Sequence, residues 1–362
     1  MGHHAHAGAE PGAVIFGGYG VFGAHVAREL ARLGIHVVIA GRRADKAQRF
    51  AATLGPMHRG VAADVADGSS CRAVVTGETV AVNCAGPFDR FDATLVGACL
   101  QARCHYVDIA DDRAYVSLVR SYSERFRERR LAAVYGCSSL PGISGALGLV
   151  ARENMDRVPE RARVTLFIGN RSPKGTAAIR SAVGAIGKSI VAPQGTLVGF
   201  RDREVVPLPE PLGRRAVYNF ESPDYDVLPD LLGTRSLSVK LGFELRMVTG
   251  SFALLAFLSS NYGDRTAKLL EWLGKPLGRL GSSGAVVQTE LFFGDGSMRS
   301  AALLARRDGQ RMAALPCALV VQRLCENKCN PSGAMTAYDL LGAMALIDRL
   351  VSEGFELHHS SA

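Results

Sequence analysis

The sequence has few aromatic residues and no run of like charges, which argues against a nucleic-acid-binding protein. Of its 362 residues 7% are aromatic and one is tryptophan, and its 42 basic residues, 35 of them arginine, are scattered along the chain. No basic stretch is interleaved with aromatic residues. Nucleic-acid-binding proteins concentrate such residues on one surface, so no nucleic-acid partner is predicted.

The sequence also has no stretch long enough to cross a membrane. Its most apolar stretch, Met247–Leu258, has 12 residues, whereas a spanning helix needs about 20. This stretch is either a buried helix or an apolar surface, such as the wall of a site for a lipid-like substrate or a patch that contacts a membrane peripherally. Residues 1–12 have no apolar core of a secretory leader, so a disordered lead-in is predicted there.

Cysteine motifs for metal ions are missing as well. The eight cysteines include no CxxC pair. Because free cysteine usually packs as a small apolar side chain, no metal site is predicted. Without a secretory leader, reduced thiols and a cytoplasmic location are expected.

The composition is that of an ordinary folded protein with an excess of positive charge. Hydrophobic residues make up 48% and charged residues 21% of the chain, and its length suits two domains. The formal net charge is +8, with an isoelectric point of about 9.2. This excess favours an anionic ligand, such as a phosphorylated cofactor.

Short apolar runs alternate with helical patterns over the first 140 residues. The expected strands are 13–16, 36–40, 61–65, 79–84, 104–109 and 131–136, and the expected helices include 21–33, 44–54, 92–102 and 111–130. This alternation indicates βαβ units and a parallel sheet. We therefore expect an α/β fold, with a doubly wound parallel sheet of Rossmann type over 13–142.

The pattern changes after residue 142. Residues 143–312 predict a second, α+β domain for substrate binding and dimerisation, including a hairpin of 286–293 and 297–305 turned at Gly294–Gly296. Helices near 313–325 and 336–352 close the chain. We expect the segment 313–362 to pack back on the first domain.

A glycine motif follows the first predicted strand. Gly18, Gly20 and Gly23 match G-x-G-x-x-G. In this motif the first glycine makes the tight turn, the second lets the backbone approach a pyrophosphate and the third lets the helix pack on the strand. Because a helix N-terminus attracts anions, the residues from Gly18 to Gly23, which include Tyr19, Val21 and Phe22, are predicted to bind a dinucleotide.

The end of the second predicted strand distinguishes between dinucleotides. NAD sites usually have an acidic residue there, as FAD sites do, whereas this chain has Arg42 and Arg43. A guanidinium binds phosphate through two parallel hydrogen bonds, so both arginines are predicted to hold the 2′-phosphate of NADP(H). They could instead be solvated residues at a helix start. Asp64 either lies against the adenine edge or caps the next helix.

Three further strand ends are expected at the same edge of the sheet. At this point the chain resembles the saccharopine dehydrogenase-like family. The resemblance is carried by VIFGGYGVFG (14–23), AGRR (40–43), VNCAGPF (82–88), ACLQARCHYVDIADD (98–112) and CSSLPG (137–142), and more weakly by 333–341. The chain looks closest to a poorly characterised bacterial branch, because it has IADD where members that form amino acids tend to have a glycine before a glutamate.

The resemblance implies an NADP-binding Rossmann domain, an α+β domain and often a homodimer. Members reduce an imine formed from an amine and a carbonyl compound, or the double bond of an enoyl lipid chain. The resemblance also implies that a loop formed by Ala85, Gly86, Pro87 and Phe88 lies beside the cofactor. Tyr106 could donate a proton or only fix the cofactor, and Asp108 could orient Tyr106 or cap the next helix. Ser138 and Ser139 could bind substrate or begin a helix.

Other catalytic signatures are missing from the sequence. It has no tyrosine followed four residues later by lysine, and no GxSxG, HExxH or P-loop motif. We therefore expect an NADPH-dependent oxidoreductase that transfers hydride to a C=N or polarised C=C bond of a small molecule. The alternative is a non-catalytic NADP(H)-binding sensor or scaffold protein.

Overall fold

The computed structural model describes residues 12–153, 155, 157–173, 176–274, 276–326 and 330–361. These residues form two compact units. The first contains the described residues up to Ala110, with Ala114–Tyr135 and Cys317–Thr336, and the second contains Asp111–Arg113, Gly136–Pro316 and the described residues from Ala337 onward. The predicted lead-in lies outside the described residues except for Gly12, which begins the first strand.

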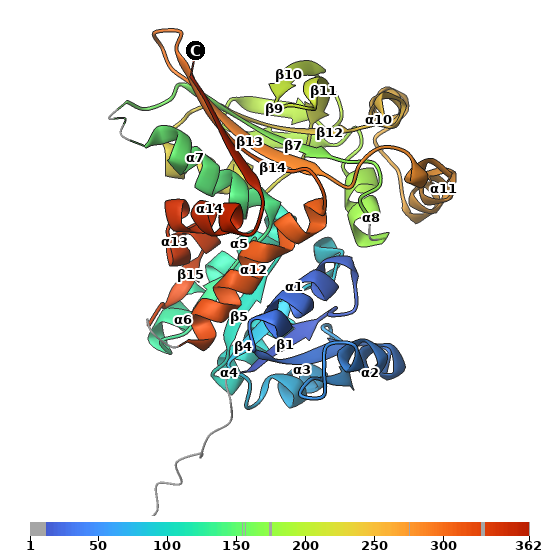
Figure 1. Ribbon diagram of the computed structural model, residues 1–362, viewed down its shortest axis with the longest axis vertical. Coiled ribbons are helices and arrows are strands. Elements are labelled where there is room, and N and C mark those ends of the chain that lie inside the picture. The colour runs from blue at the N-terminus through green and yellow to red at the C-terminus, as the bar shows by residue number, and fades with distance from the viewer. Residues whose placement is uncertain are drawn as a thin grey trace, which may run out of the picture. The chain divides into compact units, whose positions relative to one another are not determined.

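The first unit is built around a parallel sheet of seven strands (Figure 1). In chain order these are β1 (Gly12–Phe16), β2 (His36–Gly41), β3 (Arg59–Ala62), β4 (Val80–Asn83), β5 (His105–Asp108), β6 (Ala132–Val134) and β15 (Gly333–Met335). Their order in the sheet is β15-β6-β5-β4-β1-β2-β3. The chain reverses direction across the sheet between β1 and β4, which is the switch point where such sheets bind ligands. The predicted Rossmann-type fold is confirmed.

Helices connect and cover these strands. They are α1 (Val21–Arg32), α2 (Ala44–Ala52), α3 (Gly68–Val75), α4 (Thr94–Ala102), α5 (Arg113–Ser121) and α6 (Ser123–Glu128). Helix α1 packs against β1 and β2, and α2 against β2 and β3. Strand β1 (GAVIF) is therefore buried along its whole length, which explains why it is a continuous apolar run rather than an alternating one.

Three details of the first unit differ from the sequence-based expectation. The third strand lies at Arg59–Ala62 rather than 61–65, and the helix expected over 111–130 is divided into α5 and α6 at Tyr122. Strand β15 was not predicted. It has three residues, too few to show a period of two, and it pairs with β6, about 200 residues earlier in the chain.

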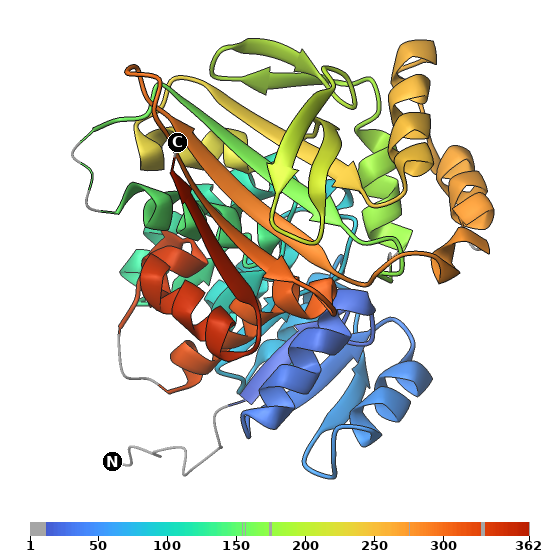
Figure 2. The ribbon, with the colours of Figure 1, turned by 45° about the horizontal axis from the view of Figure 1, so that its top comes forward.

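The second unit contains a mixed sheet in the order β10-β11-β12-β7-β13-β14-β16, whose long strands are drawn in Figure 2. Its strands are β7 (Arg161–Ile168), β10 (Glu204–Leu208), β11 (Gly213–Asn219), β12 (Leu237–Phe243), β13 (Ala285–Phe292), β14 (Met298–Ala305) and β16 (Glu356–Ser361). Strands β8 (Ser189–Ala192) and β9 (Gly195–Val198) form a separate hairpin. Strands β13 and β14 are antiparallel, as the sequence predicted.

One face of this second sheet packs against helices, and the other packs against β10 and β11 of the same sheet. The helices are α7 (Ser144–Arg152), α8 (Thr176–Gly184), α9 (Asp224–Leu232), α10 (Arg246–Leu258), α11 (Asp264–Gly274), α13 (Ala337–Leu341) and α14 (Ala343–Ser352), while α12 (Gly309–Cys325) spans the division between the units. On β7, Leu166 and Ile168 pack with α8, α10 and α11. The next side chain, Phe167, points to the other face, where it packs with β10 and β11.

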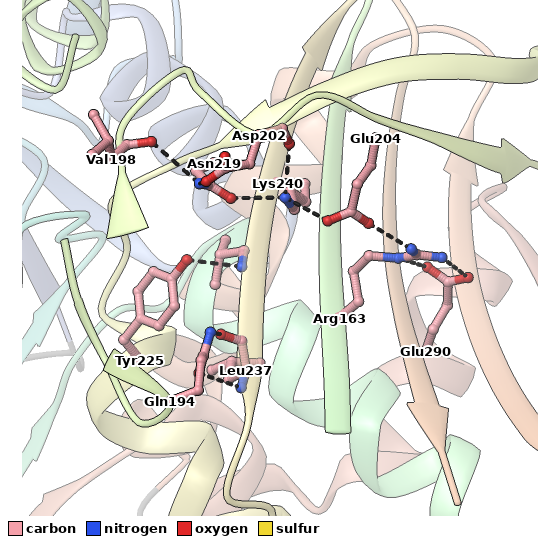
Figure 3. Close-up of polar contacts among 11 residues, drawn as sticks. Arg163, Gln194, Val198, Asp202, Glu204, Asn219, Tyr225, Leu237, Lys240 and Glu290 are labelled. Atoms are coloured by element: carbon pink, nitrogen blue, oxygen red, sulfur yellow. Dashed lines mark hydrogen bonds and ion pairs between the residues drawn. The ribbon is translucent and has the colours of Figure 1, made fainter. Parts of the chain in front are cut away.

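A partly buried ion network joins β10 to β12, β7 and β13 of the same sheet (Figure 3). The Lys240 side chain is 2% exposed, and its Nζ lies 2.6 Å from Glu204 of β10 and 2.7 Å from Oδ1 of Asn219. Arg163 donates to Glu204 at 2.8 Å and, through Nε and Nη2, to both carboxylate oxygens of Glu290 at 2.7 and 2.8 Å. Two cations therefore face two carboxylates. This balance indicates a structural role.

The C-terminal part differs from expectation, and the structure distinguishes between the two alternatives for the apolar stretch. The helix expected over 336–352 is interrupted at Gly342, whose φ of +82° favours glycine. Residues 317–336 belong to the first unit and those from 337 onward to the second. Helix α10 is not fully buried, because one of its faces is exposed. Within the described part of the chain, no helix combines the length and the apolar character that crossing a bilayer requires.

Candidate cofactor site

The turn between β1 and α1 depends on Gly17. Its φ is +72°, and its N–H donates to the Ala40 carbonyl at 2.9 Å. A Cβ at Gly17 would lie 2.8 Å from backbone atoms of Cys84 and Ala85. The left-handed conformation needed for the turn thus belongs to Gly17 and not to Gly18, to which the motif assigned it. The same close approach sets this turn against the loop that follows β4.

The three motif glycines allow α1 to begin directly on this turn. A Cβ at Gly23 would lie 2.3 Å from the Gly17 carbonyl oxygen, and one at Gly18 would lie 2.9 Å from the Ile15 carbonyl oxygen. Gly20 is exposed and precedes the first helical residue. Any side chain at Gly23 would therefore push the first turn of the helix away from the strand.

The N-terminus of α1 provides an anion-binding site. Gly20 has no side chain that could cap the helix, and the first turn of α1 contains no acidic residue. The N–H groups of Val21, Phe22 and Gly23 lie in the first turn, where no helical carbonyl can accept from them. The positive end of the helix dipole reinforces them. The geometry therefore suits the pyrophosphate of a dinucleotide.

Arg42 and Arg43 follow β2 and are both exposed. Arg43 donates to both carboxylate oxygens of Asp45 at 3.2 and 2.9 Å, and it holds the pKa of that carboxyl well below its usual range. Arg42 takes part in none of the hydrogen bonds and ion pairs found among the described residues. The Tyr19 hydroxyl accepts from the Arg43 backbone N–H at 3.2 Å, and its ring would contact a Cβ at Gly41. Tyr19 therefore lies across the end of β2.

Asp64 makes a local turn. Its Oδ1 accepts from the Ala66 N–H at 3.1 Å, while the side chain that caps α3 is Asp67. Of the two roles left open for Asp64, capping of the next helix is therefore performed by a neighbour. An adenine contact at Asp64 stays a prediction.

The loop after β4 is held by two residues that the sequence analysis missed. Asn83 Oδ1 accepts from the Ala85 N–H at 3.1 Å, and Asn83 Nδ2 donates to the Tyr115 hydroxyl at 3.1 Å. The Phe88 ring packs on the Tyr115 ring with 5.3 Å between centroids. Gly86 is exposed and Phe88 is buried. Asn83 could have been noticed as a polar residue in an otherwise apolar strand.

Tyr106 belongs to the same buried cluster. Its side chain is 0% exposed, and its hydroxyl lies 2.9 Å from the Tyr115 hydroxyl. Burial, with a smaller effect of the Asp108 charge, raises the pKa of Tyr106 well above its usual value. Asp108 is also fully buried, and its Oδ1 accepts from the Ala110 N–H at 3.0 Å. Tyr106, Asn83 and Tyr115 thus form a buried, hydrogen-bonded cluster under the loop that follows β4.

Ser138 and Ser139 lie in the second unit. The Ser138 N–H donates to the Gly136 carbonyl at 2.7 Å, and its carbonyl accepts from the Ile143 N–H at 2.9 Å. Ser139 is buried in the short helical turn before α7. These contacts are those of a helix start, which was one of the two predicted roles. A contact with substrate stays a prediction.

Comparison with known proteins agrees with the glycine turn and the sheet order. Residues 13–134 match the family model of the saccharopine dehydrogenase NADP binding domain. The apo, histidine-tagged saccharopine dehydrogenase (L-Glu forming) from Saccharomyces cerevisiae is 13% identical, with a TM-score of 0.67 over 97% of this chain and 100% of that chain. At this identity the likeness shows the fold alone.

Two further solved structures match about a third of this chain. A short-chain type dehydrogenase/reductase from Mycobacterium ulcerans is 16% identical (TM-score 0.30, 35% of this chain and 66% of that chain). Serine dehydrogenase from Escherichia coli is 15% identical (TM-score 0.28, 34% of this chain and 80% of that chain). No curated protein matches the sequence.

The fold and the site define a dinucleotide-binding domain at the switch point of a doubly wound sheet. Residues 13–134 are a saccharopine dehydrogenase NADP-binding domain, and the cofactor is NADP(H). The presence of this domain supports assigning the protein to the class of NADP-dependent oxidoreductases.

Proposed function

We propose that the protein is an NADPH-dependent reductase of saccharopine dehydrogenase type, which transfers hydride to an imine or to a polarised C=C bond. The observation that carries this proposal is the open N-terminus of α1, set at the switch point beside the loop after β4. When bound, NADPH supplies the hydride. The chain supplies binding and orientation.

Each part of the site has a separate task in this proposal. The N–H groups of Val21, Phe22 and Gly23 bind the pyrophosphate. Arg42 binds the 2′-phosphate, because the Arg43 guanidinium is already paired with Asp45. The loop that contains Ala85, Gly86, Pro87 and Phe88 borders the cofactor, and Asn83 fixes its first residues.

Tyr106 acts in this proposal as a positioning residue. Its full burial and its hydrogen bond to Tyr115 favour fixing of the cofactor loop over proton donation. With Tyr106→Phe we expect KM for NADPH to rise about threefold to tenfold, since one buried hydrogen bond contributes about 0.5–1.5 kcal/mol, while kcat stays within about twofold. A large loss of kcat with unchanged NADPH affinity would instead identify Tyr106 as the proton donor.

A second candidate is a non-catalytic NADP(H) sensor or scaffold. The observation that favours it is the complete burial of both predicted catalytic residues, Tyr106 and Asp108. Such a protein would bind NADPH without oxidising it.

Turnover of NADPH distinguishes the two candidates. The protein would be mixed with NADPH and with pairs of amino acids and 2-oxo acids, or with enoyl thioesters, and NADPH absorbance followed. The reductase proposal expects oxidation with one of these classes, abolished in a variant that cannot bind the cofactor. NADPH binding without oxidation by any of them would support the sensor. We also propose that the protein is a homodimer, that it is cytoplasmic and that it belongs to the bacterial branch of the family. Light scattering measures the oligomeric state.

A further inference from the structure

Helix α10 is apolar on the face that points to solvent as well as on its inward face. The inward face consists of four buried residues, Thr249, Phe252, Ala253 and Ala256. The outward face carries four exposed side chains, Met247 (67%), Leu254 (61%), Phe257 (69%) and Leu258 (70%). A surface helix normally has polar residues on the side away from the core. An apolar outward face implies that something covers it.

The exposed apolar face continues onto the following helix. Figures 1 and 2 both show α10 and α11 side by side at the edge of the second unit. Leu269 (54%) and Trp272 (65%) are exposed on α11, and Leu280 (54%) follows shortly after. Most of the large exposed apolar side chains of the described residues therefore lie on α10, on α11 or just after α11. We call these seven residues, from Met247 to Leu280, the α10–α11 surface.

Positive charge accompanies the α10–α11 surface. Residues 246–280 contain five basic and two acidic residues, a net charge of +3. Four of the basic residues are exposed, namely Arg246, Arg265, Lys268 and Arg279. The Arg201 guanidinium also lies 4.6 Å from the centroid of the Phe257 ring. The apolar side chains thus share this segment with an excess of cationic side chains.

This combination of apolar and cationic side chains distinguishes between two occupants. A second copy of the chain would place the same surface against itself in a two-fold dimer, so that its like charges would face one another. A layer of anionic lipid headgroups offers both partners, because acyl chains accept the apolar side chains and phosphates face the cations. Tryptophan on such a surface is typical of the membrane interface.

We propose that the α10–α11 surface docks the protein peripherally onto an anionic lipid surface. Leu254, Leu258 and Trp272 enter the boundary between headgroups and acyl chains. Arg265 and Lys268, which lie about two turns and one turn before Trp272 respectively, on the same exposed side of α11, face the lipid phosphates.

The single tryptophan makes a direct test possible. Because Trp272 is the only tryptophan, fluorescence of the full-length protein reports on this surface alone. We expect a blue shift and co-sedimentation with vesicles of phosphatidylcholine containing about 30% phosphatidylserine, and much weaker binding to phosphatidylcholine alone or at high salt. The double variant Leu254→Ser/Leu258→Ser should bind anionic vesicles at least about tenfold more weakly.

Two controls keep the test decisive. Val191→Ser changes a residue that is equally exposed (68%) elsewhere in the second unit, and it should leave vesicle binding unchanged. An unchanged urea unfolding curve shows that each variant is folded, because the substituted residues lie in the second unit whereas NADPH binds to the first. An unshifted Trp272 spectrum, with the protein left in the supernatant of anionic vesicles, would overturn the proposal. A blue shift that grows with protein concentration without lipid would also overturn it, in favour of a second copy.

Discussion

We predict that Asp224 makes the stability of the second unit depend on pH. This first residue of α9 is fully buried and accepts hydrogen bonds from Ser144 Oγ at 2.5 Å and from Ser222 Oγ. Burial nevertheless raises the pKa of Asp224 to about 6, from 3.8. The increase in pKa caused by desolvation of the carboxylate thus exceeds the decrease caused by the hydrogen bonds from the two serine hydroxyls.

The sign of the effect follows from the direction of this shift. A folded-state pKa above the unfolded value contributes stability below about pH 4, and this stability is lost as the pH rises through about 6. A shift of about two units corresponds to about 3 kcal/mol at most, since each unit is about 1.4 kcal/mol. Asp224→Asn removes the titration, while both serine hydroxyls keep a partner because they can donate or accept.

Urea unfolding at several pH values measures this difference. The free energy of unfolding of the natural protein, minus that of Asp224→Asn, should fall by about 2–3 kcal/mol between about pH 4 and about pH 7.5. Asp230→Asn, an exposed residue of the same helix, should show no such trend. Parallel pH curves for the natural protein and Asp224→Asn would refute the reasoning.

Two further substitutions test the packing of each unit. Gly23→Ala places a Cβ 2.3 Å from the Gly17 carbonyl oxygen, so NADPH affinity in a fluorescence titration should fall at least about tenfold. The matched control Gly97→Ala lies in α4 with no heavy atom near its Cβ, and should leave affinity unchanged. Glu290→Ala removes a buried carboxylate from the half-buried Arg163, and should lower the free energy of urea unfolding by about 3 kcal/mol. A loss below about 1 kcal/mol would contradict that role for the ion network.

The sequence predicted the first unit well because its signals are local. Strands such as β1 are short apolar runs, since helices bury both faces of a parallel sheet. The glycines of the turn are also adjacent in the chain, so their spacing was readable. Only the positive φ, which belongs to Gly17, required the structure.

The features that the sequence did not predict depend on residues far apart in the chain. Asn83 and Tyr115 are 32 positions apart, and Arg163 and Glu290 are 127 apart. No local pattern joins such pairs. Helix α10 illustrates a different limit, because a stretch that is apolar on all sides has no period that tells which side is buried.

The central claim, that Arg42 and the α1 N-terminus bind NADP(H), is tested most directly by titrating NADPH and NADH into the natural protein, Arg42→Ala and Arg103→Ala. Arg103 is exposed at the end of α4, at the opposite edge of the sheet. We expect the natural protein to bind NADPH more tightly than NADH. In Arg42→Ala the affinity for NADPH should fall about 5- to 30-fold, since an exposed charged hydrogen bond contributes about 1–2 kcal/mol. Arg103→Ala should bind like the natural protein. Equal affinity for both nucleotides, or an unchanged preference in Arg42→Ala, would contradict the claim.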